Sequence, residues 1–179
     1  AFNNTPMGYG LPGAIGAAFA LDGKRRVICI AGDGSLMMNI QEMATLRHHN
    51  LPIKLFLVNN GGYSMVQQTQ EQWLDRRYFA SSGGAEGGLS FPDFNALAAS
   101  CGIGSLDVAV NGDIDTAVAR VLEVPGPMLC NLHIPSGARV IPQCKFGYPI
   151  EDSEPLLPRD EFLANMIVKP LPVSLKEPE

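Results

Sequence analysis

The stretch VICIAGDGSLMMN, residues Val27–Asn39, decides the fold. Its first half is a continuous β-branched and apolar run, which is typical of a strand buried on both faces of a parallel sheet. The run ends in Gly-Asp-Gly-Ser, with a single carboxylate, Asp33, between two glycines. A carboxylate in that position is either a solvated turn residue or a ligand for a positively charged group.

The same strand pattern recurs along the chain and alternates with helix patterns. We expect strands at 26–31, 53–58, 106–110 and 128–134, and helices at 11–21, 39–49, 92–100 and 114–122. Asn39, followed three residues later by Glu42, predicts a capping-box start for the second helix. Strands that alternate with helices predict an α/β fold, a three-layer domain whose mostly parallel sheet is covered by helices on both faces.

The alternation of strand and helix patterns ends after Pro135. Seven prolines between residues 142 and 178 interrupt every regular pattern, which leaves room for one short helix at 159–166. We therefore expect an α/β domain at residues 1–148 and an extended proline-rich C-terminal arm at 149–179.

Composition narrows the class of protein. The net charge is −5 and no basic run offsets it, which argues against nucleic acid or an anionic membrane as a partner. The four cysteines form no C-x-x-C pair, and Cys29 and Cys130 lie inside apolar runs, so we expect free buried thiols in a reducing compartment. No apolar run reaches the length that spans a bilayer. These features predict a cytoplasmic enzyme-like domain.

Two loops should meet at one edge of the sheet. Between Gly34 and Asn59 lie 24 residues, enough for a turn, one helix and one strand. If the flanking strands are neighbours, Asp33 and the run Asn59–Gly62 share the carboxyl edge, where ligands of parallel sheets collect. A carboxylate, an amide and a backbone carbonyl are hard oxygen ligands, which suit Mg²⁺.

The glycine-flanked loop also offers backbone N–H groups. Those of Gly32, Gly34 and Ser35 are unhindered and can cradle a phosphate. The metal and the phosphates would neutralise each other. The two loops together therefore predict a diphosphate cofactor held through a divalent cation.

These residues resemble a known family. GDGSLMMN followed by VNN is similar to the thiamine diphosphate fingerprint, and MGYGLPGAIGAAFA is similar to the segment that precedes it in acetolactate synthases and related 2-keto acid decarboxylases and carboligases. The resemblance is strongest over Thr5–Val66. It implies the C-terminal, diphosphate-binding domain of such an enzyme.

The resemblance implies roles for single residues. Asp33, the side chain of Asn60 and the backbone carbonyl of Gly62 would bind Mg²⁺, and Met7 would bend the cofactor. With the phosphate cradle and the matching methionine at position 65, the candidate cofactor-binding residues are Thr5, Met7, Gly32, Gly34, Ser35, Asn60, Gly62 and Met65.

Two positions depart from the family pattern. Thr5 stands where the family usually has glycine, and Thr69 stands where acetolactate synthases carry a tryptophan that shapes the pocket for the second keto acid. The 2-keto acid and its acceptor are therefore left open.

The implied activity is the decarboxylation of a 2-keto acid and transfer of the resulting acyl carbanion to an acceptor. The resemblance also implies a glutamate on a separate pyrimidine-binding domain, and no segment of this chain resembles that domain. We therefore expect half an active site, completed by another region or subunit, in a homo-oligomer. The sequence assigns no catalytic acid or base.

Two other functions compete with this one. Gly8, Gly10 and Gly13 fit G-x-G-x-x-G, and Asp33 follows 20 residues later, which is the pattern of an NAD-dependent dehydrogenase. That alternative lacks an apolar strand before the glycines and leaves Asn59 and Asn60 unexplained. A non-catalytic interaction module would require degenerate metal loops, and these loops are intact.

Some further residues allow a functional or a structural interpretation. His133 ends a strand, where a packed or surface histidine is commoner than a catalyst. Trp73, Tyr78 and Phe79 could wall a pocket or pack a lid.

Overall fold

The computed structural model describes residues 6–84, 87–144 and 147–175. The chain divides into two compact units, Ala1–Ala138 and Arg139–Glu179. The boundary expected after residue 148 falls inside the second unit, and the interpretation of 149–179 as an extended arm stays a prediction.

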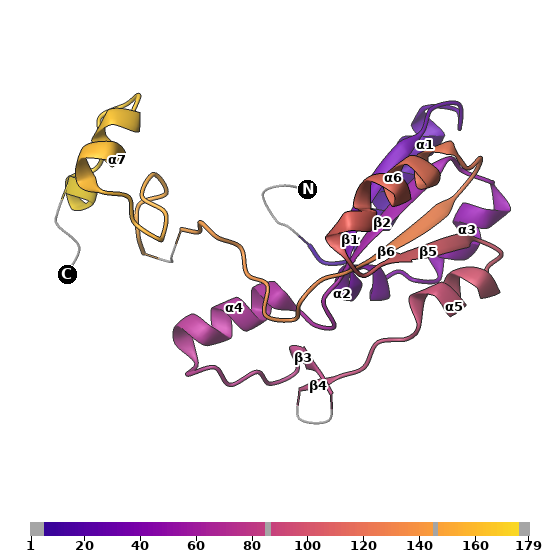
Figure 1. Cartoon of the computed structure of the whole chain (residues 1–179), viewed down its shortest axis with the longest axis horizontal. Coiled ribbons are helices and arrows are strands. Elements are labelled where there is room, and N and C mark those ends of the chain that lie inside the picture. Colours follow the sequence, from indigo (N-terminus) through magenta and orange to yellow (C-terminus); the bar gives the residue numbers. More distant parts are fainter. Residues whose placement is uncertain (1–5, 85–86, 145–146, 176–179) are drawn as a thin grey trace. The chain divides into compact units, whose positions relative to one another are not determined.

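The first unit is built on a four-stranded parallel sheet (Figure 1). Its strands, in spatial order, are β1 (Val27–Gly32), β2 (Ile53–Asn59), β6 (Met128–His133) and β5 (Gly104–Val108). All three pairings are parallel, so every connection between neighbouring strands is a crossover. The parallel sheet that the sequence predicts is confirmed.

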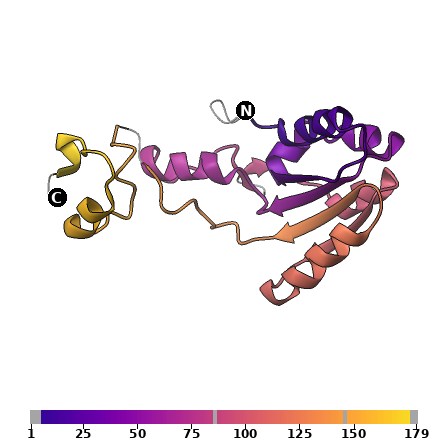
Figure 2. The ribbon, with the colours of Figure 1, turned by 90° about the horizontal axis from the view of Figure 1, so that it is seen from above.

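Helices cover both faces of this sheet (Figure 2). One face carries α1 (Gly10–Ala20), α2 (Asp33–Met37), α3 (Glu42–His48) and α5 (Phe94–Ser100), and the other carries α6 (Ile114–Glu123), preceded by the 3₁₀ turn η1 (Asn111–Asp113). A larger apolar core fills the first interface and a smaller one lies under α6. The three-layer prediction is therefore confirmed. None of the helices in the described ranges is long and apolar enough to cross a membrane.

Two helices were missed from the sequence: α2, and a longer one that follows β2. Helix α4 (Ser64–Trp73) follows β2, and the short parallel pair β3 (Ser82–Gly83) and β4 (Gly88–Leu89) comes after it. The buried side chains of α4 are glutamines, which bond to backbone: Gln67 donates to the Ser81 carbonyl at 2.7 Å. A helix whose buried face is polar gives no apolar periodicity to recognise.

The capping box predicted at Asn39 is wrong. Helix α3 starts at Glu42, its cap residue Gln41 makes no side-chain cap bond, and the Asn39 amide instead donates to the Gly8 carbonyl at 2.7 Å. A contact over 31 residues has displaced a local one. The side chain that does cap a helix is Asp93, which accepts from two N–H groups at the start of α5.

The cysteines give a prediction about thiol reactivity. Burial raises the pKa of the Cys29 and Cys130 thiols to about 11, so both stay protonated and unreactive at pH 8. Cys144 is exposed. We expect Ellman's reagent at pH 8 to modify Cys144 first and to reach the two buried thiols only after denaturant is added.

Peptide mapping of the labelled protein checks this expectation. Cys144→Ser should remove the fastest phase. Rapid labelling of Cys29 or Cys130 in the native protein would show that these two thiols are not buried in the sheet.

The second unit has its own polar centre. It contains α7 (Arg159–Asn165) and the 3₁₀ turn η2 (Pro172–Leu175). Arg159 donates to both carboxylate oxygens of Asp152, at 2.8 and 3.1 Å, and its guanidinium lies 4.7 Å from the centroid of the Phe162 ring. Side chains that are 16% and 10% exposed make this a largely desolvated ion pair, which holds α7 to the preceding loop.

Candidate functional site

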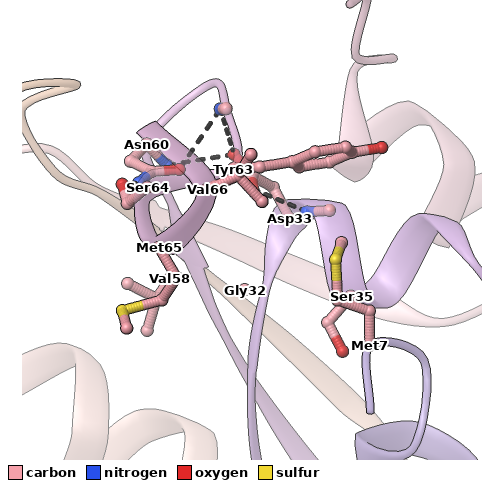
Figure 3. A pocket seen from close by; sticks show the side chains of 12 residues that line it. Met7, Gly32, Asp33, Ser35, Val58, Asn60, Tyr63, Ser64, Met65 and Val66 are labelled. Atoms are coloured by element: carbon pink, nitrogen blue, oxygen red, sulfur yellow. Dashed lines mark hydrogen bonds between the residues drawn. The ribbon is translucent and has the colours of Figure 1, made fainter. Parts of the chain in front are cut away.

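The carboxyl ends of β1 and β2 lie side by side. Gly32 is paired with Val58, so the loop after β1 and the loop after β2 share one edge of the sheet, as predicted. A cavity of about 210 Å³ opens there (Figure 3). It is lined by residues that the sequence singled out and by four others: Met7, Gly32, Asp33, Gly34, Ser35, Asn60, Gly62 and Met65, with Val58, Tyr63, Ser64 and Val66.

The sequence therefore predicted most of the lining of this cavity. Thr5, the remaining candidate, lies outside the described residues. The four residues that it missed follow or precede the Asn-Asn-Gly-Gly run, and Val58 and Tyr63 are its immediate neighbours. Their position in the sequence next to that run could have indicated them. Because helix α4 was not predicted, the sequence did not show where the chain runs after Gly62.

Asp33 is a buried carboxylate and not a solvated turn residue. It is 1% exposed and opens α2, so the turn expected here is the first turn of a helix. Its Oδ1 accepts from the Gly34 N–H at 2.6 Å, and its Oδ2 accepts from the N–H groups of Asn60, Gly61 and Gly62 at 3.1, 2.6 and 3.2 Å. Burial raises the pKa of Asp33 above its usual value, and these four bonds act in the opposite direction.

Asn60 and Gly62 are hydrogen-bonded to each other within the loop after β2. The Asn60 Oδ1 accepts from the Gly62 N–H at 3.2 Å, and its Nδ2 donates to the Ser64 hydroxyl. A Cβ on Gly62 would lie 2.9 Å from the Ser81 carbonyl oxygen, so only glycine lets the loop pass this close to backbone. Asp33 and Asn60 thus line one cavity.

The segment of Met7 and Gly8 closes the other side. The Gly8 N–H donates to the Ser35 hydroxyl at 3.0 Å, which ties this segment to the first turn of α2. A Cβ on Gly34 would lie 2.3 Å from the Tyr63 ring and 3.1 Å from the Met7 methyl group. The backbone at Gly34 is therefore flanked by two side chains, one from the segment before α1 and one from the loop after β2.

The aromatic residues after α4 lie elsewhere. Tyr78 and Phe79 line a separate cavity of about 310 Å³ with Arg76 and Arg77, and Trp73 is 55% exposed at the end of α4. None of the three aromatic side chains is among the described residues that line the Asp33 cavity.

The glycines of the dinucleotide alternative have packing roles. A Cβ on Gly10 would lie 3.3 Å from that of Ala31, so this glycine lets α1 pack closely on β1. A Cβ on Gly13 would lie 2.9 Å from the Tyr9 ring, so this glycine makes room for the aromatic residue at the N-cap of α1. Gly8 has φ +89° and makes the turn before α1. The described residues 6–9 form no strand ahead of these glycines, so the arrangement that the fingerprint requires does not occur there.

Comparison with known proteins identifies the family of the chain. Residues 2–132 match the family described as "Thiamine pyrophosphate enzyme, C-terminal TPP binding domain". The acetolactate synthase large subunit of Parasynechococcus marenigrum (strain WH8102) is 40% identical over 141 residues, which are 79% of this chain and 22% of that protein. The acetolactate synthase isozyme 1 large subunit of Escherichia coli (strain K12) is 38% identical over 144 residues, 79% of this chain and 24% of the relative.

A solved structure agrees. The thiamine diphosphate-dependent 4-hydroxybenzoylformate decarboxylase of Rhodococcus jostii RHA1 superposes with a TM-score of 0.60 at 29% identity, over 72% of this chain and 23% of that one. The chain thus spans about a quarter or less of the proteins it matches. The comparisons give the dinucleotide alternative no support. The chain belongs to the thiamine pyrophosphate enzymes, and it is their C-terminal TPP-binding domain that it matches.

Proposed function

We propose that this chain is the diphosphate-binding half of an acetolactate synthase-like enzyme, which decarboxylates a 2-keto acid and transfers the acyl carbanion to an acceptor. The observation that carries the proposal is the single cavity in which Asp33, Asn60 and Gly62 meet Met7, Gly34 and Ser35. That cavity lies within the segment that matches the TPP-binding family.

The residues present fit a magnesium ion. A buried carboxylate whose pKa is raised by burial gains most from a nearby cation, because the cation offsets the cost of keeping the charge out of water. Carboxylate, amide and carbonyl oxygens suit Mg²⁺, and no cysteine or histidine is among the described residues of the lining. Asp33, the Asn60 side chain and the Gly62 carbonyl would hold the ion, which would neutralise a diphosphate there.

The first turn of α2 fits the diphosphate. Gly32, Gly34 and Ser35 bring backbone close to the cavity, and Tyr63 and Met7 lie so near Gly34 that a side chain there would clash. Thiamine diphosphate, when bound, supplies the carbon nucleophile and the electron sink for decarboxylation. Met7, Tyr63 and Met65 would exclude water around it, and Thr5 would contact its aminopyrimidine through backbone.

Gly34→Ala should weaken cofactor binding. The new methyl group would clash with the Tyr63 ring at 2.3 Å, so Tyr63 must move into the cavity or α2 must move away from it. We expect the Kd for thiamine diphosphate in Mg²⁺ to rise about tenfold, which corresponds to about 1.4 kcal/mol.

Gly16→Ala is the matched control for this substitution. It lies on α1, where a Cβ meets nothing within 4 Å, so it should leave the affinity unchanged. Calorimetric titration of both variants makes the comparison. Wild-type affinity in Gly34→Ala would remove Gly34 from the cofactor cradle.

Thr69 bears on the acceptor. It lies one turn after Met65 on α4, and its hydroxyl donates to the Met65 carbonyl at 3.1 Å. A short side chain bonded to its own helix leaves more room than the tryptophan of acetolactate synthases. We therefore propose an acceptor pocket wider than theirs.

The rest of the active site would come from other chain segments. A pyrimidine-binding domain, from another region or another subunit, would supply the acidic group for the aminopyrimidine, and the relatives are about four times longer than the matched segment. We propose a homo-oligomer on this ground. The buried thiols of Cys29 and Cys130 support a reducing compartment such as the cytoplasm.

A thermal-shift panel tests the ligand class. Thiamine diphosphate with Mg²⁺, at about 100 times its Kd, should stabilise the chain by about 2.7 kcal/mol, and for a chain of this size that raises the melting temperature by about 5 °C or more. Thiamine, which lacks the diphosphate, and NAD⁺ should each shift it by less than about 1 °C. A shift with NAD⁺ alone would contradict the proposal.

A further inference from the structure

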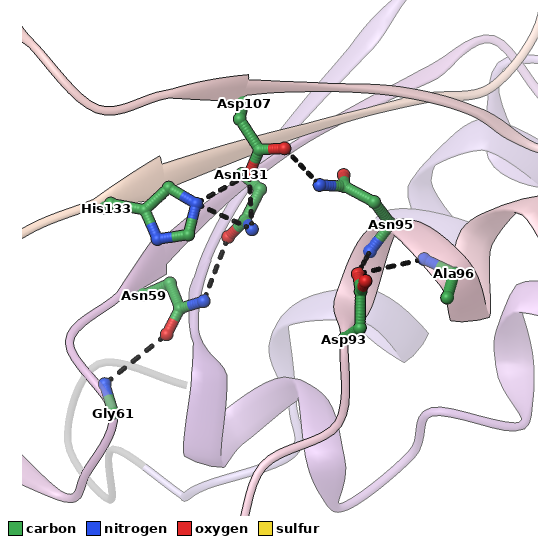
Figure 4. Close-up of polar contacts among 8 residues, drawn as sticks. All are labelled: Asn59, Gly61, Asp93, Asn95, Ala96, Asp107, Asn131 and His133. Atoms are coloured by element: carbon green, nitrogen blue, oxygen red, sulfur yellow. Dashed lines mark hydrogen bonds and ion pairs between the residues drawn. The ribbon is translucent and has the colours of Figure 1, made fainter.

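A polar cluster adjoins the loop that would hold the metal. Its members lie at the carboxyl ends of three neighbouring strands: Asn59 on β2, Asn131 and His133 on β6, and Asp107 on β5 (Figure 4). The register pairs Asn59 with His133 and Asn131 with Asp107. These residues line a cavity of about 300 Å³ that is distinct from the one around Asp33. The resemblance to the family assigned none of them a role.

One carboxylate fixes the direction of the hydrogen bonds that join Asp107, Asn131 and Asn59. An ionised Asp107 can only accept, so Asn131 must present its Nδ2, which lies 2.9 Å from the Asp107 Oδ1. The Asn131 Oδ1 then accepts from the Asn59 Nδ2 at 3.1 Å. Because Asn131 is only 3% exposed, these bonds offset the cost of burying its amide.

This orientation also affects the loop Asn59–Gly62, which would hold the metal. With its Nδ2 held by Asn131, Asn59 must turn its Oδ1 the other way, toward the Gly61 N–H at 3.3 Å. The same N–H already donates to the Asp33 Oδ2 at 2.6 Å. Gly61 therefore has two acceptors in place, Asp33 and Asn59.

The Asp33 Oδ2 is crowded. It accepts from three N–H groups, those of Asn60, Gly61 and Gly62, although a carboxylate oxygen has only two lone pairs. Turning this oxygen to a cation requires that some of these donors go elsewhere. Gly62 could use Asn60, but the Asn60 oxygen is itself a candidate metal ligand. Asn59 offers the acceptor that the metal does not need.

We propose that Asn59 is a positioning residue that takes over the Gly61 N–H when Asp33 turns to the divalent cation, with its amide held in orientation by Asn131 and Asp107. This inference rests on the proposed function. Asn59 touches neither the metal nor the substrate. It acts by stabilising the loop conformation in which Asp33 is free to bind.

The test uses the whole 179-residue chain and two readouts. In Asn59→Ala we expect the Kd for thiamine diphosphate in Mg²⁺ to rise about tenfold, the effect typical of losing a partner behind a metal ligand. By NMR, amide exchange at Gly61 should be about tenfold faster than wild type in the loaded protein and unchanged in the metal-free protein, where Asp33 still accepts.

Asn95→Ala is the matched control. Asn95 donates to the other oxygen of Asp107 and has no contact with the metal loop among its described bonds. It should leave both readouts at wild-type values. An equal loss in both variants would mean that the cluster acts only by general stability, and this would overturn the inference.

Asn59→Asp separates two functions of the side chain, accepting from the Gly61 N–H and donating to Asn131. The substitution replaces the donor to Asn131 with a carboxylate oxygen, and either carboxylate oxygen can accept from the Gly61 N–H. Exchange at Gly61 in the loaded protein should therefore stay within about threefold of wild type. If Asn59→Ala does not fold, this variant decides, and fast Gly61 exchange in it overturns the inference. Wild-type affinity and wild-type Gly61 exchange in Asn59→Ala would overturn this inference and leave the proposed function standing. Failure of the wild-type chain to bind would overturn the proposed function as well.

Discussion

Asp33→Asn should lower the affinity of the chain for thiamine diphosphate in Mg²⁺ by about 100-fold or more. Among the described residues that line the cavity, Asp33 carries the one formal negative charge, which the substitution removes. Loss of a residue that merely supports a metal ligand costs about 10- to 100-fold, so loss of the charged ligand should lie at or above the top of that range. In EDTA the weak residual binding of the two proteins should be equal.

The fold should tolerate this change. Asparagine has the size of aspartate and keeps an oxygen for the loop N–H groups, while the bond from Gly34 is lost. The sign of the charge effect is favourable: since burial raises the pKa of Asp33, its ionised form at neutral pH costs stability in the metal-free protein, and asparagine removes that cost. The two effects oppose each other, so we expect the melting temperature to change by only about 4 °C.

Asp93→Asn is the matched control. Its side chain caps α5 and does not line the Asp33 cavity, and asparagine caps a helix as well as aspartate does. Magnesium-dependent affinity should be unchanged. Wild-type affinity in Asp33→Asn would instead remove Asp33 from the metal site.

The second large effect concerns activity. The isolated chain, loaded with thiamine diphosphate and Mg²⁺, should decarboxylate pyruvate at least about 100-fold more slowly than a chimera in which it replaces the matched 141-residue segment of the cyanobacterial relative. The reason is that the acidic group that activates the aminopyrimidine is expected on another domain. Such an acid–base group contributes about 10²- to 10⁴-fold.

Carbon dioxide release, measured with a panel of 2-keto acids, checks this expectation. The chimera that also carries Asp33→Asn is the control and should be inactive. Equal rates in the isolated chain and the chimera would show that the chain holds a complete active site and would contradict the half-site proposal.

The sheet and the cavity lining could be predicted because they depend on local patterns. The apolar runs of β1 and β2 have the composition of parallel strands. β2 is largely buried, whereas Ile28 and Ile30 on one face of β1 are exposed. Asp33 and Asn60 follow these strands directly, so adjacency of β1 and β2 was enough to bring them together.

The rest depended on contacts that no local pattern records. The buried side chains of helix α4 are glutamines, which give no apolar pattern. Asn39 donates to the Gly8 carbonyl, 31 residues away, instead of capping a helix. The cluster around Asn131 depends on the spatial order β2-β6-β5, which joins residues as much as 72 positions apart. A parallel sheet predicted from sequence leaves that order open.

The measurement that tests the central claim most directly is calorimetric titration of the metal-stripped chain with thiamine diphosphate, once in EDTA and once in Mg²⁺. We predict binding in Mg²⁺ that is at least about 100-fold tighter than in EDTA, a difference of about 2.7 kcal/mol, because the cation joins the diphosphate to Asp33 and Asn60. Equal affinity in the two titrations would contradict a metal-bridged diphosphate site at this edge of the sheet.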